Sequence, residues 1–179
     1  MNVKKILLLG AESTGKTTLA QALARHYQTS WVGEYLREFV IEQQRLPQPS
    51  EQLPIAHTQI AHESVALATA QNYLFCDTGP CMTALYSAYC FGECPAELTN
   101  LAQQHRYDLV LVTHTDIAWQ ADGIQRDSPA AQLAIHQHLL ALLQDWGWDY
   151  TLVSGTETAR LEQVTSLLDS RFGLSPASP

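Results

Sequence analysis

The sequence predicts a three-layer α/β fold built on a five-stranded parallel β-sheet. Five short apolar runs, each of strand length, are spaced along the 179 residues. Several of these runs lack polar alternation, which is typical of strands buried on both faces of a parallel sheet. Amphipathic helical patterns lie between the runs, and a regular alternation of strands with helices favours this layered architecture.

Each predicted strand is an apolar run followed by a polar residue or a glycine. The five runs are residues 5–9, 30–32, 73–76, 109–112 and 150–153. Helical spacing marks the segments between them, most clearly where Leu19, Leu23, Ala24 and Tyr27 share one helical face. Similar patterns around residues 60–68, 139–146 and 161–168 complete the alternation.

The length of the chain fits one domain with one sizeable core, and we expect that domain to cover residues 1–172. Residues 173–179 are rich in serine, proline and glycine, so a flexible C-terminal tail is expected there. Residues 46–54 contain three prolines and little periodicity, which predicts a surface loop.

The charge balance restricts the partners of this chain. A formal net charge of −8 argues against a general surface for nucleic acid or for an anionic membrane, although a few backbone amides can still form a local anion site. The first residues hold an apolar run too short for a signal-peptide core or a membrane span. We therefore expect a cytoplasmic protein with reduced cysteines, whose partners are small molecules.

The turn after the first predicted strand carries the strongest motif. Residues 10–17 match G-x-x-x-x-G-K-[ST] at every fixed position, between a strand and an amphipathic helix. In such a phosphate-binding loop (P-loop), glycines let backbone amides surround the phosphates, and the helix N-terminus adds its positive dipole end. The residues expected to bind nucleotide are Gly10, Glu12, Ser13, Thr14, Gly15, Lys16, Thr17 and Thr18.

The motif predicts a kinase-like P-loop NTPase fold that uses ATP and Mg²⁺. Lys16 is expected to neutralise the β- and γ-phosphates, and the Thr17 hydroxyl is expected to ligate Mg²⁺. Asp77 ends the third strand, where a carboxylate can hold Mg²⁺ or receive a proton; the plain alternative is a helix cap. Thr17 and Asp77 are thus the candidate metal ligands.

A second acidic residue follows the second predicted strand. Glu34 could accept the proton of an attacking hydroxyl, or could be a solvated glutamate at a helix start. Arg37, one helical turn later, could bind a phosphate or pair with Glu34. The sequence leaves the choice of base between Glu34 and Asp77 open.

The polar segment 114–126 follows the fourth predicted strand, where small kinases place a segment that closes over the substrate. Trp119 offers a flat face to an aromatic or cationic ring, and Asp122 could bind ribose hydroxyls. Arg126 could stabilise the transferring phosphoryl group. The alternative is a loop with a half-buried tryptophan and an incidental arginine.

Together these motifs resemble the nicotinamide riboside kinase domain of the NadR family, over nearly the whole chain. The resemblance is carried by the P-loop, Glu34-Tyr35-Leu-Arg37, Ile55-Ala-His-Thr-Gln59, Phe75-Cys-Asp77-Thr78 with Thr83, Tyr107-Asp-Leu, and Trp119…Asp122-Gly123…Arg126. It implies transfer of the ATP γ-phosphoryl group to the 5′-hydroxyl of nicotinamide riboside, in salvage of pyridine nucleotides. The acceptor residues that it implies are Glu34, Tyr35, Arg37, Asp77, Trp119 and Asp122.

Two other interpretations remain open. A P-loop kinase for another nucleoside or metabolite would share every residue above except the roles of Trp119 and Asp122. A nucleotide-dependent regulatory NTPase is the second, because Thr113-His-Thr-Asp116 faintly resembles the guanine-reading T-K-x-D of GTPases, with histidine in place of lysine.

Overall fold

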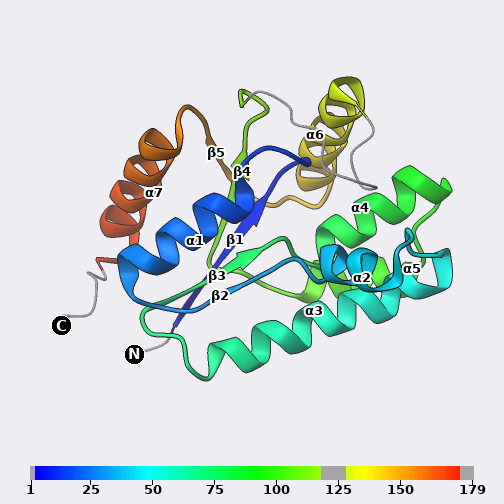
Figure 1. Ribbon diagram of the computed structural model, residues 1–179, viewed down its shortest axis with the longest axis horizontal. Coiled ribbons are helices and arrows are strands. Elements are labelled where there is room, and N and C mark those ends of the chain that lie inside the picture. The colour runs from blue at the N-terminus through cyan, green and yellow to red at the C-terminus, as the bar shows by residue number, and fades with distance from the viewer. Residues whose placement is uncertain (1–2, 118–127, 174–179) are drawn as a thin grey trace.

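The computed structural model describes residues 3–117 and 128–173. Within these ranges the chain forms a five-stranded parallel sheet in the order β2-β3-β1-β4-β5, with helices on both faces (Figure 1). This confirms the predicted three-layer α/β fold and its parallel sheet. Trp119, Asp122 and Arg126 lie outside the described residues, as does the stretch 174–179, most of the predicted tail.

All five predicted strands occur within one or two residues of their expected positions. They are β1 (Lys4–Leu9), β2 (Trp31–Val32), β3 (Tyr73–Asp77), β4 (Leu109–Thr113) and β5 (Thr151–Val153). The helices are α1 (Lys16–Tyr27), α2 (Tyr35–Gln43), α3 (Gln52–Leu67), α4 (Pro80–Phe91), α5 (Ala96–Gln104), α6 (Pro129–Asp145) and α7 (Glu157–Phe172). In the described part of the chain, no helix has the length and apolarity that crossing a membrane requires.

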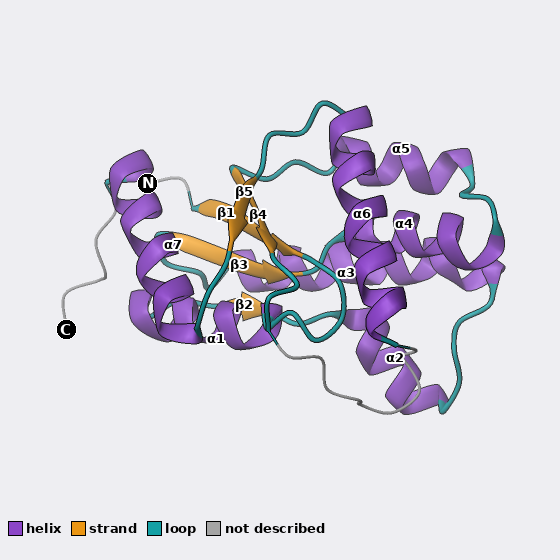
Figure 2. Cartoon of the chain, turned by 90° about the horizontal axis from the view of Figure 1, so that it is seen from above, coloured by secondary structure: helices purple, strands orange, loops and turns teal. Residues whose placement is uncertain are grey.

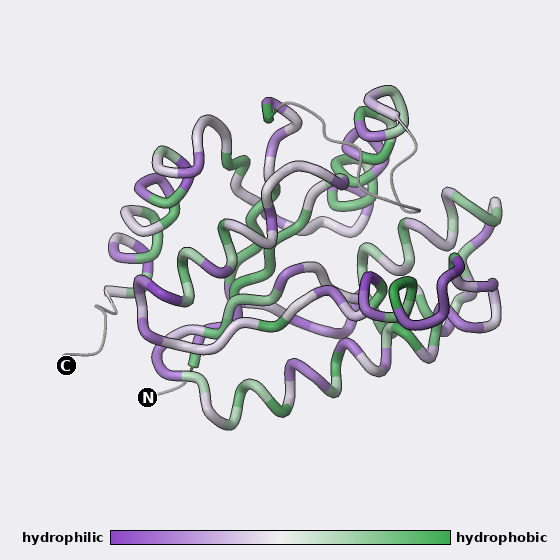
Figure 3. The backbone as a smooth tube through the Cα atoms, in the orientation of Figure 1, coloured by the Kyte–Doolittle hydropathy of each residue, from purple (hydrophilic) through white to green (hydrophobic). Residues whose placement is uncertain are grey.

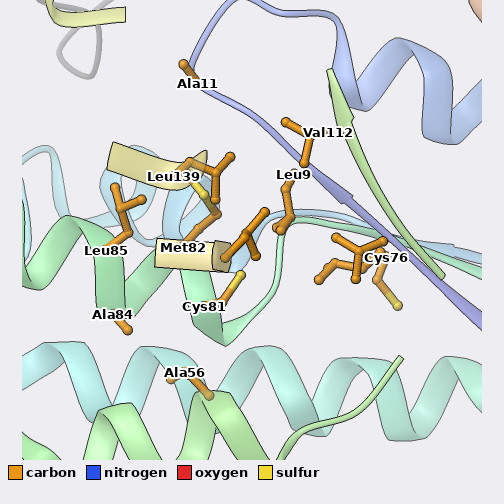
Figure 4. Packing of buried hydrophobic residues seen from close by; sticks show 14 of the residues in the cluster. Leu9, Ala11, Ala56, Cys76, Cys81, Met82, Ala84, Leu85, Val112 and Leu139 are labelled. Carbon is orange, nitrogen blue, oxygen red and sulfur yellow. The ribbon is translucent and has the colours of Figure 1, made fainter. Parts of the chain in front are cut away.

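Side chains of the central strands alternate between two cores, one on each face of the sheet. In β1, Leu7 and Leu9 pack with α3, α4, α5 and α6, whereas Ile6 and Leu8 pack with α1 and α7. Figure 2 shows these two groups of helices on opposite sides of the sheet, and the central strands are hydrophobic over most of their length (Figure 3). Figure 4 shows the first core around Leu9. Burial on both faces explains why the strands lack polar alternation.

The segment 46–54, predicted to be a surface loop, is partly helical. Pro49 begins a single turn of 3-10 helix, η1 (Pro49–Glu51), and Pro54 lies in the first turn of α3. A proline costs little in a first turn, because the N–H that it lacks would have no helical partner there. Gln48 and Glu51 exchange side-chain-to-backbone hydrogen bonds across the start of this turn. The prolines therefore mark a helix start, and the prediction of a loop was wrong for residues 49–54.

A buried charge network ties α3 to the first residues of β1. The Glu63 side chain is 1% exposed and accepts a hydrogen bond from the Tyr107 hydroxyl at 2.8 Å. Its other oxygen lies 3.1 Å from Lys5 Nζ and 2.7 Å from His105 Nε2. Burial acts to raise the pKa of Glu63, but the His105 bond and the Lys5 charge outweigh it and lower that pKa below its usual value.

Replacing Glu63 with glutamine is expected to lower the free energy of unfolding at pH 7 by roughly 1–3 kcal/mol, because Lys5 loses its buried counter-charge. A carboxyl whose pKa is lowered by folding stabilises above its unfolded-state pKa, and this stability is lost as the pH falls through the folded-state pKa. In urea denaturation, the difference between wild type and Glu63→Gln should therefore shrink below about pH 4. The exposed Glu162→Gln variant serves as control, and a difference that is independent of pH would contradict this role for Glu63.

The order of the strands positions the site. β1 lies between β3 and β4. The strands that follow β1 in the chain, β2 and β3, lie on one side of it, and β4 and β5 lie on the other side. In open parallel sheets such a switch point leaves a crevice at the carboxyl ends of the strands. The P-loop follows β1, Glu34 follows β2, and Asp77 ends β3, so the fold brings these three to one edge.

Candidate active site

The P-loop connects β1 to α1 in a conformation that requires glycine at two positions. Gly10 has φ 150°, and a Cβ there would lie 2.3 Å from Thr113 Oγ1, a distance that real Cβ atoms do not reach. Gly15, immediately before α1, has φ 78° in the left-handed region. Ser13 also has a positive φ, 57°. These turns curl the loop around the N-terminus of α1, as the motif predicts.

Hydrogen bonds inside the loop fix this shape. The Thr14 hydroxyl donates to the Ala11 carbonyl at 2.7 Å and lies 2.6 Å from Thr113 Oγ1 at the end of β4. Lys16 Nζ donates to the same Ala11 carbonyl at 2.8 Å. Lys16 is only 9% exposed, so its ammonium group lies over the loop rather than in solvent. There it can meet the β- and γ-phosphates of a nucleotide held by the loop amides.

Thr17 and Asp77 meet at the carboxyl end of β3. The Thr17 hydroxyl donates to Asp77 Oδ2 at 2.5 Å, and the buried Oδ1 of Asp77 has no hydrogen-bond partner among the described residues. Burial raises the pKa of Asp77, while the charge of Lys16, the Thr17 bond and the charge of Arg37 oppose this rise. A hydroxyl beside a carboxylate with one unused oxygen is a donor set of the kind that Mg²⁺ prefers, so these two residues fit the predicted metal site.

Glu34 leads from β2 into α2 and is half-buried. Its pKa is raised to about 7, chiefly because burial disfavours the charged carboxylate. The nearby Asp77 and Glu12 carboxylates raise the pKa further, whereas Lys16 and Arg37 lower it. A carboxyl group that titrates near neutral pH beside the phosphate site has the property expected of a general base.

One cavity of about 300 Å³ extends from the P-loop to Glu34. Glu34 and Arg37 line it, and aromatic side chains of α4 form another part of its wall. These aromatic residues are Tyr86, Tyr89 and Phe91. The cavity therefore combines a phosphate-binding loop with aromatic side chains, and Glu34 is among the residues that line it.

Two residues predicted to bind a ligand, Glu12 and Tyr35, have side chains that are engaged with other parts of the protein. Glu12 accepts a hydrogen bond from the Tyr86 hydroxyl, so its carboxylate is held against α4, although its main chain belongs to the P-loop. Gln132 Nε2 of α6 donates to the Glu12 carbonyl at 2.7 Å. Tyr35, predicted to bind the acceptor, is not among the described residues that line the cavity; its ring packs edge-on against His62, 5.3 Å between centroids.

Several residues of the site escaped the sequence analysis. Tyr86, Tyr89, Phe91 and Gln132 lie in helices with an ordinary apolar pattern, so only the packing of α4 and α6 against the P-loop brings them to the cavity. Gln59 was recognised only as part of a motif. Its amide accepts from the Tyr35 N–H at 2.8 Å and donates to the Gly33 carbonyl at 3.2 Å, which fixes the backbone on both sides of Glu34.

Asp116, which suggested a guanine-reading motif, is engaged within the protein. One of its carboxylate oxygens accepts from the Arg160 guanidinium, and the other accepts from the Gly155 N–H at 2.6 Å. Burial acts to raise the pKa of Asp116, but the Gly155 N–H bond and the charge and hydrogen bond of Arg160 together outweigh it and lower that pKa, so the carboxylate stays ionised. Reading a guanine base requires a free carboxylate, so this geometry argues against the GTPase-like interpretation.

Comparisons with known proteins show which family this chain belongs to and which folds it resembles. A family model described as an AAA domain matches residues 5–160. The trifunctional NAD biosynthesis/regulator protein NadR of Escherichia coli (strain K12) is 28% identical over 175 residues, which cover 95% of this chain and 40% of the relative. A NadR protein solved in complex with NR superposes with a TM-score of 0.81 at 20% identity, over 99% of this chain and 54% of that chain. A thymidylate kinase from Ehrlichia chaffeensis gives a TM-score of 0.62 at 16% identity, over 93% of this chain and 100% of that chain.

The predicted resemblance to NadR is thus found in both sequence and fold. The chain spans about two-fifths of the length of the NadR protein of E. coli that it matches. The solved structures share its fold, which is that of the P-loop kinases. Since the family model covers most of its length, the chain belongs to the AAA domain family of P-loop proteins.

Proposed function

We propose that the P-loop kinase formed by this chain transfers the γ-phosphoryl group of ATP to the 5′-hydroxyl of nicotinamide riboside, giving nicotinamide mononucleotide. The observation that carries this proposal is the single cavity in which the P-loop, the Glu34 carboxyl and the aromatic residues of α4 meet. Such a cavity can hold a nucleotide and a ring-bearing alcohol side by side, as an in-line transfer requires. The similarity to NadR, one structure of which contains NR, supports the same acceptor.

In this mechanism the protein mainly positions groups and stabilises charge. The P-loop amides and Lys16 hold the β- and γ-phosphates and neutralise the charge that develops on them. Thr17 and Asp77 would hold Mg²⁺, which supplies additional positive charge to the phosphates when bound. Arg37 also lines the cavity, close to Glu34. Its guanidinium is assigned to contact the phosphoryl group as it moves to the acceptor.

The geometry favours Glu34 over Asp77 as the base. Asp77 is engaged by the Thr17 hydroxyl, and its remaining oxygen is the natural metal ligand. Glu34 lines the cavity, and its pKa of about 7 allows it to take a proton from a hydroxyl at neutral pH. We therefore assign the metal role to Asp77 and proton abstraction to Glu34. Trp119 and Asp122 keep the roles that the NadR resemblance implies, ring stacking and ribose binding, and Arg126 keeps its predicted role in stabilising the transferring phosphoryl group.

The charge of the cavity supports a cationic acceptor. The Asp77 and Glu12 carboxylates both lie close enough to Glu34 to raise its pKa, so three acidic groups gather at the site. Nicotinamide riboside carries a permanent positive charge on its pyridinium ring. Both the carboxylates and the aromatic faces of α4 attract such a cation, whereas ordinary nucleosides are neutral.

The acceptor test is ADP release from ATP and Mg²⁺ with nicotinamide riboside, neutral nucleosides and reduced dihydronicotinamide riboside, which has nearly the same shape but no ring charge. We expect kcat/KM for nicotinamide riboside to exceed that for the reduced form by roughly tenfold or more, since one charge–ring contact is worth about 1–2 kcal/mol. Equal values for the charged and reduced forms would refute selection by charge. A neutral nucleoside as the best acceptor would instead favour a kinase for another metabolite.

A further inference from the structure

We propose that Arg160 is a positioning residue for the nucleotide site, whose guanidinium fixes the P-loop by joining the Thr14 carbonyl to the ends of β4 and β5. This inference rests on the proposed function in one respect: it takes the P-loop to be the ATP-binding element. Arg160 lies on α7, 146 residues after Thr14, and no motif in the sequence marks it.

The contacts of Arg160 reach three separate segments. Its Nη1 donates to the Thr14 carbonyl of the P-loop at 2.5 Å, and its Nε donates to the Gly155 carbonyl after β5 at 2.9 Å. Its Nη2 donates to the His114 carbonyl after β4 at 3.1 Å and also to Asp116. Arg160 is 1% exposed, so these bonds are shielded from water. A buried arginine with every nitrogen bonded makes a rigid joint between the segments that it touches.

Asp116 completes the joint. Its carboxylate neutralises the Arg160 charge and binds the Gly155 N–H, so Gly155 is held through both its N–H and its carbonyl. A buried guanidinium without such a partner would be strongly unfavourable. The pair therefore explains how a fully charged side chain can lie directly behind the P-loop.

The bond to Thr14 sets the direction of a loop amide. In a planar trans peptide the C=O and the following N–H point in opposite directions. Holding the Thr14 carbonyl toward Arg160 therefore turns the Gly15 N–H away from α7. A Cβ on Gly15 would lie 3.6 Å from Arg160 Nη1, which shows how closely the guanidinium supports this peptide. The Thr14 hydroxyl is already held by Ala11 and Thr113, so Arg160 supplies the second restraint on the same residue.

The test measures ATP–Mg²⁺ affinity by titration calorimetry without acceptor, in wild type and in Arg160→Lys. Lysine keeps the charge opposite Asp116 but cannot reach the three carbonyl groups together. Losing one hydrogen bond from a charged donor corresponds to roughly 10- to 100-fold weaker binding, and we expect Kd for ATP to rise by that factor. Steady-state kinetics should show a matching rise in KM for ATP with little change in KM for the acceptor.

Two further variants make the result decisive. Tyr27→Phe removes a different bond to α7, from the Tyr27 hydroxyl to Asp169 at 3.1 Å, and should leave the Kd for ATP unchanged while lowering Tm. Asp116→Asn keeps an acceptor oxygen for Arg160 but removes its counter-charge at a partly exposed site, so it should lower Tm and weaken ATP binding by at least about threefold; it gives a second test if Arg160→Lys does not fold. The positioning role would be overturned if folded Arg160→Lys or Asp116→Asn bound ATP with the wild-type Kd. It would also be overturned if Tyr27→Phe raised the Kd for ATP as much as these two variants do. Absence of ATP binding in the wild type would instead refute the proposed function.

Discussion

Replacing Lys16 with alanine is expected to reduce kcat/KM for phosphoryl transfer by roughly 10³-fold or more while leaving the fold intact. The ammonium group of Lys16 lies against the P-loop, where it bonds to the Ala11 carbonyl. Its loss removes a full positive charge from the place where the transition state becomes most negative. Removing even one neutral donor from such a site typically costs about 10²–10³-fold. The measurement is ADP release at saturating Mg²⁺, with circular dichroism to verify folding.

The matched control is Lys4→Ala. Lys4 begins β1 at the opposite end of the strand from the P-loop and forms a partly exposed ion pair with Asp108. Because this pair lies far from the P-loop and is partly screened by solvent, turnover should stay near the wild-type rate. If folded Lys16→Ala turned over as fast as wild type, the assignment of residues 10–17 to phosphate binding would be wrong.

Glu34→Gln is expected to reduce kcat by about 10²–10⁴-fold, the usual contribution of a positioned general base. The pH dependence gives the sharper signature. A base works in its deprotonated form, so wild-type kcat/KM should rise with pH and reach half its plateau near pH 7, where Glu34 titrates. Glutamine cannot titrate, and the residual activity of the variant should lose this dependence. Initial rates between pH 5.5 and 8.5 would measure both effects.

Asp77→Asn separates the two acidic residues. If Asp77 holds the metal, this variant should require much more Mg²⁺ for half-maximal rate. Its pH profile should persist because Glu34 is intact, but should move to lower pH because the Asp77 charge no longer raises the pKa of Glu34. An unchanged pH profile in Glu34→Gln, together with loss of the profile in Asp77→Asn, would assign the base to Asp77 instead.

The layered fold could be predicted because each of its elements has a local cause. β1 and β4 are continuous apolar runs that only a sheet covered on both faces can bury, and the P-loop motif determines its own turn through Gly10 and Gly15. Asp77 and Glu34 could be found because each follows a predicted strand, and parallel strands gather their carboxyl ends at one edge.

The remaining features depend on contacts between segments far apart in the chain. Arg160 has no neighbours in sequence that mark it, because its partners lie after β1, β4 and β5. In α3, Val65 and Leu67 mark a helix by their spacing but lie exposed, whereas the polar Glu63 is buried by its bonds to other elements. The periodicity of the sequence identifies the helix. It cannot show that the face carrying Glu63 is buried, because that burial depends on charged partners from other elements.

The bond between Lys16 and the Ala11 carbonyl has a consequence for how the loop binds a phosphate. Because the ammonium group has a partner within the loop, the protein itself satisfies this buried charge. An arriving phosphate then exchanges one acceptor for a stronger one, and little backbone has to be ordered. We expect the P-loop to have nearly the same backbone conformation with and without nucleotide, and the main change on binding to be a new rotamer of Lys16.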